Sequence, residues 1–203
     1  MDIKKFMFKK FEIKKINVIF FIILLMGMIF GALSVKFVSS QTLTKLNFLF
    51  ATELELRNSG FNISNFFSSL GISSVFALSV IISSLSFFGA VIIFLLILFR
   101  GFGIGFALGY ICAVYSLKGV ALNTFVMLPG IFVSCIGTVI LASESLKFSF
   151  KFARKIFPNC DSGSLWNSFA ELLKKTSLIS IVFILSALID FLFFGIFSKF
   201  FQF

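Results

Sequence analysis

The run 16-INVIFFIILLMGMIFGALSV-35 decides the class of this fold, because it carries no charged residue. Its 20 residues are long enough to cross about 30 Å of hydrocarbon as a single α-helix. Six lysines precede it in the segment 1–15. The apolar core of a signal peptide is only about 7–15 residues long, so we expect an uncleaved first transmembrane helix behind a basic N-terminal segment.

The composition of the whole chain agrees with a membrane protein. Of its 203 residues, 59% are hydrophobic and 13% are charged, and the mean hydropathy is +1.11. The charged share is about half that of a soluble domain, which is too small to cover a water-facing surface. Histidine is absent, which removes His-based acid–base catalysis, His-ligated zinc and nucleophile–His pairs. We expect no enzyme activity, no cofactor and no metal, and the absence of histidine agrees with this expectation.

Four more apolar segments follow the first one. The sequence predicts spans at 72–99, 101–116, 119–142 and 177–197. The turn between the second and third spans is then very tight and falls at Arg100. Segment 36–71 is predicted to form an outer loop and segment 143–176 a cytoplasmic loop. Because there is no internal repeat or linker, we expect residues 1–203 to form one all-α domain, a polytopic membrane bundle of five helices.

The distribution of basic residues predicts the orientation of the bundle. Lysine and arginine concentrate in the cytoplasmic segments of membrane proteins. With the N-terminus inside, that side receives thirteen basic residues: the six lysines of segment 1–15, Arg100 and six in the cytoplasmic loop. The outer side receives five. We therefore expect the N-terminus inside and the C-terminus outside, in a multi-pass protein of the cell membrane.

Both loops contain amphipathic patterns that are typical of interfacial helices. In the outer loop, apolar residues recur at helical spacing in segments 43–54 and 63–70. In the cytoplasmic loop, a predicted apolar stripe lies opposite a basic face. The stripe comprises Leu146, Phe150, Ala153 and Phe157, and the face comprises Lys147, Lys151, Arg154 and Lys155. The basic face favours anionic lipid, with docking of a cytoplasmic protein as the alternative. Nucleic-acid binding has little support, because no folded soluble module is present to carry it.

A stripe of small residues marks the predicted third span. Residues four apart lie on one helix face, and a face without large side chains lets a neighbouring backbone approach closely. We expect this face to pack within the chain, with an intersubunit or partner-binding groove, and hence a homo-oligomer, as the alternative. Similar stripes in spans one and four are expected to meet it or each other. The stripe of the third span is Gly101, Gly105, Gly109 and Ala113.

Two single residues stand out in the later spans. Pro129 removes a backbone donor from span four, which predicts a kink, and a broken helix at a transport site is the alternative. Asp190 is the charged residue well inside a predicted span, and such a residue is a candidate functional site. We expect it to face the bundle as a neutral hydrogen-bonding group. Contact with a partner, or transfer of an ion or proton, are the other interpretations.

The segment 100-RGFGIGFALGY-110, followed by Lys118-Gly119 and Leu128-Pro129, resembles the stage II sporulation protein M family. The resemblance implies five spans and a scaffold without hydrolase chemistry. It further implies that the scaffold holds the peptidoglycan-degrading stage II sporulation proteins D and P at the septal or mother-cell membrane during forespore engulfment. The runner-up function, from the residues alone, is a transporter or permease subunit that uses the Pro129 break and Asp190. An intramembrane protease is disfavoured, because the spans lack paired aspartates, histidine or a Ser–Lys dyad.

Overall fold

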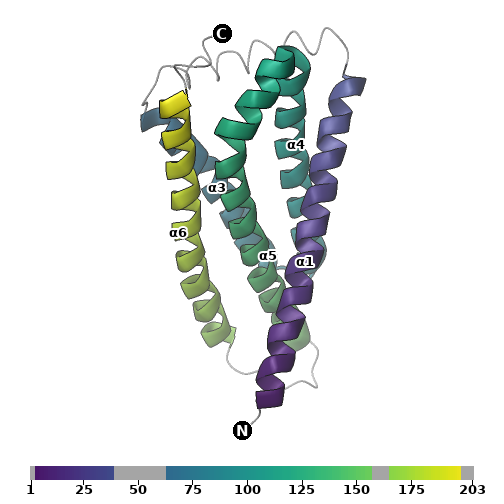
Figure 1. Ribbon diagram of the computed structural model, residues 1–203. Helices are drawn as coiled ribbons and strands as arrows, with labels where there is room; N and C mark the ends of the chain where they lie inside the picture. Colours follow the sequence, from purple (N-terminus) through teal and green to yellow (C-terminus); the bar gives the residue numbers. More distant parts are fainter. Residues whose placement is uncertain (1–2, 39–62, 157–164, 198–203) are drawn as a thin grey trace.

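The computed structural model describes residues 3–38, 63–156 and 165–197, and these form a bundle of helices. Five of the helices are long and apolar enough to cross a membrane. Their order is α1 (Ile3–Ser34), α3 (Ile63–Ser84), α4 (Gly89–Leu122), α5 (Leu128–Ile156) and α6 (Leu165–Phe197), with a short 3-10 helix η1 (Val35–Phe37) and a π-helix η2 (Asn123–Met127). Successive long helices run in opposite directions, so α1 begins at one end of the bundle and α6 ends at the other (Figure 1). We call these the N-terminal end and the C-terminal end.

The expected turn at Arg100 is wrong, although the described residues contain, as expected, five helices that are long and apolar enough to cross a membrane. The chain instead reverses between α3 and α4, at residues 85–88. There the backbone N–H groups of Leu85 and Ser86 donate to carbonyl oxygens of the preceding turn, at 3.1 Å each. α4 begins at Gly89. This position requires glycine, because a Cβ here would collide with the carbonyl oxygen of Ser83. The predicted span 72–99 therefore covers the second part of α3, the turn and the first part of α4. The predicted span 101–116 belongs to the same helix α4.

The predicted bounds of the last two spans are also wrong. α5 runs without interruption to Ile156, so segment 143–156 continues a membrane helix and is not a separate loop helix. Of the predicted apolar stripe, Leu146 is buried, Phe150 is exposed and Ala153 is half-buried, while Phe157 lies outside the described residues. α6 begins at Leu165, earlier than the expected residue 177.

The two amphipathic segments of the predicted outer loop have different outcomes. Segment 63–70 forms the first turns of α3. Segment 43–54 lies outside the described residues.

The core lies around α5. Half of its candidate span is buried within the protein, against 17–28% for the other four spans. Large side chains on the outward faces of those four helices are exposed, as expected for surfaces that contact lipid. Since lipid tails are as apolar as leucine, close packing and polar contacts are the main sources of helix association. The contacts of α5 and the contact between α1 and α4 therefore carry the fold.

Candidate functional site

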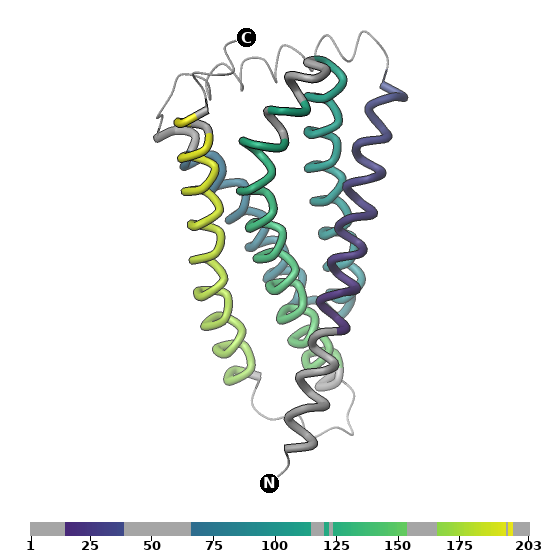
Figure 2. The backbone as a smooth tube through the Cα atoms, in the orientation of Figure 1, coloured from purple at the N-terminus to yellow at the C-terminus, as the bar shows by residue number. Residues whose placement is uncertain are grey.

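Two small-residue faces meet where α1 packs against α4, and the two helices run side by side along most of α1 (Figure 2). A Cβ on Gly101 would collide with the carbonyl oxygen of Leu24, and one on Gly105 with that of Met28. A Cβ on Gly109 would lie 2.9 Å from the Cα of Ala32. The stripe is thus covered by backbone of the same chain, and a homo-oligomer built on these glycines would have to displace α1.

The α1 side of this contact uses glycines as well. A Cβ on Gly27 would collide with the carbonyl oxygen of Leu98, and one on Gly31 with that of Phe102. The fourth member of the predicted stripe, Ala113, is exposed. The close approach of the two backbones is seen along residues 101–109 of α4.

Asp190 joins three helices near the C-terminal end of the bundle. Its Oδ2 accepts a hydrogen bond from the hydroxyl of Ser69 on α3, at 2.7 Å. Its carboxylate occupies the space that a side chain on Gly130 of α5 would need. One turn away on α6, the Ser186 hydroxyl donates to the carbonyl oxygen of Gly130 at 2.8 Å. Because α6 is longer than expected, Asp190 lies near one end of the candidate span Trp166–Phe193 and not at its centre.

Pro129 stands at the start of α5, directly after the π-helix η2. A local π-helical adjustment is one way in which a helix accommodates a proline. The irregular backbone thus lies before Pro129 and near the C-terminal end of the bundle. The sequence predicts a kink or break at Pro129, and the π-helix η2 is a backbone irregularity directly before it.

Arg100 is the charged residue at the middle of the bundle, and the sequence analysis missed it. It lies eleven residues after Gly89 in the candidate span Gly89–Val114, which corresponds to roughly 16 Å along the helix. Its Nη2 donates to Oγ of Ser134 on α5 at 2.5 Å. Its guanidinium carbon lies 4.5 Å from the ring centroid of Phe76 on α3 and 6.0 Å from that of Phe183 on α6.

The surroundings of Arg100 satisfy its charge only in part. Among the residues that the structure describes, none accepts a hydrogen bond from its buried Nε. No described carboxylate forms an ion pair with it. Cation–π contacts contribute about 0.5–2 kcal/mol, whereas an arginine at a helix centre costs about 2.5–3.5 kcal/mol on insertion scales. Such a residue is expected to have a function beyond filling space.

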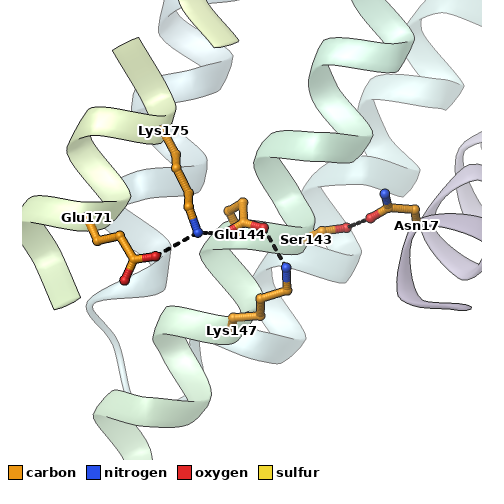
Figure 3. Close-up of polar contacts among 6 residues, drawn as sticks. All are labelled: Asn17, Ser143, Glu144, Lys147, Glu171 and Lys175. Carbon is orange, nitrogen blue, oxygen red and sulfur yellow. Dashed lines mark hydrogen bonds and ion pairs between the residues drawn. The ribbon is translucent and has the colours of Figure 1, made fainter. Parts of the chain in front are cut away.

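A network of ion pairs joins α5 to α6 toward the N-terminal end (Figure 3). Glu144 binds Lys147 at 2.5 Å and Lys175 at 2.8 Å, one lysine on each of its carboxylate oxygens. Lys175 also binds Glu171 at 2.9 Å. Beside this network, Ser143 donates a hydrogen bond to Asn17, which ties α1 to α5.

The predicted basic face is divided by this network. Lys147 points to Glu144 and is an internal ion-pair partner. Lys151 is exposed. Arg154 and Lys155 belong to the last turn of α5, and their side chains lie outside the described part of the structure.

The charged residues of the described helices do not gather at one catalytic or metal-binding position. Within the described ranges, no group of three His, Cys, Asp or Glu side chains lies close enough to hold a metal ion. These residues instead connect helices at three levels of the bundle: Asp190 near the C-terminal end, Arg100 in the middle and Glu144 toward the N-terminal end. Comparisons of the chain with protein families, with curated proteins and with solved structures find no match.

Proposed function

We propose that this chain is a membrane scaffold of the stage II sporulation protein M type. In this role it anchors peptidoglycan-degrading partners, such as the stage II sporulation proteins D and P, in the septal membrane during engulfment. The sequence resemblance, which covers about residues 99–149, is the source of this proposal. The absence of histidine from the chain agrees with a protein that does no hydrolysis itself.

The observation that supports a scaffold best is the contact of Asp190 with Ser69 and Gly130. The carboxylate accepts a hydrogen bond from α3 and packs on α5, so one side chain of α6 connects three helices. A bundle fixed in this way presents a constant outer surface to partners, which is the physical requirement of a scaffold.

We further propose that the N-terminus lies in the cytoplasm and the C-terminus outside. Because Arg100 belongs to the middle of α4, we leave it out of the count of basic residues on the two sides of the membrane. Twelve basic residues then fall on the side of the N-terminus and five on the other, and the positive-inside rule favours the same orientation. The turn 85–88 is on the cytoplasmic side in this arrangement.

Affinity purification of the full chain from sporulating cells tests the scaffold. We expect recovery of membrane-anchored peptidoglycan-degrading proteins. A matched variant, Gly105→Leu, should lose them together with the bundle, while Gly103→Leu should keep them, because a Cβ at Gly103 meets no atom within 4 Å. Recovery of an ATPase subunit in place of these proteins would contradict the scaffold.

The second candidate is a transporter or permease subunit, and the position of Arg100 favours it. Arg100 is a cation in the middle of the bundle, and no described residue accepts a hydrogen bond from its buried Nε. Such a residue is typical of a site that binds a charged substrate or ion. This function requires water to reach α6 between Phe183 and Asp190. Single cysteines placed along that stretch, in a chain whose own cysteines are replaced by serine, should then react with a membrane-impermeant thiol reagent. Full protection favours the scaffold.

A further inference from the structure

Several hydrogen-bond donors meet at the guanidinium of Arg100. Its Nη2 donates to the hydroxyl of Ser134, and the proton of that hydroxyl can in turn be donated to a further acceptor. Its Nε is enclosed by protein, and no described residue accepts a hydrogen bond from it. Its electrostatic neighbour is the thiol of Cys135, which is a weak donor. Polar hydrogens thus outnumber the acceptors that the described residues provide at this position.

The positive charge of Arg100 also has no counter-charge among the described residues. Glu144 and Glu171 bind lysines toward the N-terminal end of the bundle, and Asp190 binds Ser69 near the other end. None of these three carboxylates acts on Arg100 electrostatically. Hydrocarbon does not solvate an ion, so a charge at this depth is stabilised mainly by a group of opposite charge. The guanidinium therefore requires a negative charge within its reach.

The side chains around the guanidinium limit the kind of anion that can bind. The ring centroids of Phe76 and Phe183 lie 4.5 Å and 6.0 Å from its carbon atom, and Ser134 and Cys135 are buried. An acceptor that reaches the enclosed Nε must be small enough to fit between these groups. A monovalent anion neutralises the guanidinium. A divalent one would leave a surplus negative charge inside the membrane and would lose more hydration energy on entry.

We propose that Arg100, Ser134 and Cys135 bind a halide ion in the middle of the bundle. The ion accepts hydrogen bonds from Nε of Arg100, from the hydroxyl of Ser134 and from the thiol of Cys135, and it neutralises the guanidinium. α4 supplies the charge and α5 the other two donors, so a bound ion stabilises the contact between these helices. The halide site concerns binding and does not rest on either function proposed above.

Thermal unfolding of the full-length chain in mild detergent tests the halide site. Sodium chloride is compared with sodium gluconate at equal concentration, because both salts screen surface charges and gluconate is too large to fit between the side chains around Arg100. Chloride at ten times its Kd should raise the Tm by about 3–6 °C for a chain of this length. Bromide should have the same effect as chloride.

Three variants separate the halide site from general salt effects. Arg100→Gln should lose the Tm difference between chloride and gluconate. Lys151→Gln is the matched control, because it removes one positive charge from an exposed position on α5 and should keep the difference. Ser134→Ala keeps the charge of Arg100 and removes one donor, so it should need several-fold more chloride for the same rise in Tm. If Arg100→Gln does not accumulate, Ser134→Ala decides.

Equal Tm values of the parent chain in chloride and gluconate would overturn the halide site. A chloride effect that Arg100→Gln or Ser134→Ala leaves unchanged, or that Lys151→Gln abolishes, would overturn it too, because the ion would then bind elsewhere. Stabilisation of the parent chain by a co-purified membrane protein, and not by halide, would assign the counter-charge to a carboxylate of that protein. This result would also contradict the proposal.

Discussion

Gly105 of α4 lies so close to Met28 of α1 that no side-chain atom fits between the two backbones. Water drives soluble helices together, but lipid does not. In this bundle the glycines permit a contact area that larger residues would prevent. This relationship leads to the first prediction.

Gly105→Ala should destabilise the bundle, because its methyl group would overlap the carbonyl oxygen of Met28 and force the helices apart. Overpacking of this kind costs about 1–3 kcal/mol. Thermal unfolding in detergent measures it. Gly103→Ala is the control, since Gly103 is two residues away on the exposed face of the same helix. Equal stability of the two variants would show that α1 and α4 do not touch.

Gly130→Ala should displace Asp190 from α5. The new methyl group would overlap the carboxylate, and the Ser69 hydrogen bond depends on the position of that carboxylate. We expect a lower Tm, again from overpacking of about 1–3 kcal/mol. Gly71→Ala on α3, where a Cβ meets nothing within 4 Å, should leave the Tm unchanged or higher. A Gly130→Ala variant as stable as the parent would place Asp190 elsewhere.

Glu144→Gln should destabilise the protein more than Glu171→Gln does. The Glu144 side chain is 17% exposed and binds two lysines, whereas that of Glu171 is 57% exposed and binds one. Exposed ion pairs contribute about 0–1 kcal/mol, while removing the partner of a buried charge costs more. Chemical or thermal unfolding of both variants gives the order. The reverse order would mean that Glu144 is solvated in the membrane-bound protein.

An epitope inserted between Phe87 and Phe88 should be tolerated and should be accessible only from the cytoplasm. This turn connects α3 to α4, and in the proposed orientation it lies with the N-terminus. The same epitope inserted after Arg100 should abolish accumulation, because it would interrupt α4 in mid-membrane. Labelling from outside the cell at the first position would reverse the orientation.

The sequence predicted those parts of the fold that depend on local composition. The five spans follow from long apolar runs, and the glycine spacing pointed to the face that α4 presents to α1. The turn at 85–88 escaped detection because it contains no charged residue. The cluster of serines that precedes Gly89 is the feature of the sequence that could have indicated this turn.

Arg100 shows why the candidate site could not be read from the chain alone. A charge beside a glycine-rich run looks like the boundary of a span, and only tertiary contacts with Ser134, Phe76 and Phe183 show that it lies inside one. The contacts of Asp190 with Ser69 and Gly130 likewise join residues more than fifty positions apart. Hydropathy and helical periodicity carry no information about such pairs.

Because α1 packs closely on α4, α1 has to wait in the membrane for its partner helix to be synthesised. Gly31 leaves the ribosome about 70 residues before Gly101, which corresponds to about 4–14 s of synthesis. During that time the nascent chain holds an unfilled glycine face in the membrane, and α3, which is only 17% buried in the finished bundle, offers little cover. We therefore expect a chain truncated before α4 to be degraded faster in cells than the full chain, because the glycine face of α1 then has no helix to pack against.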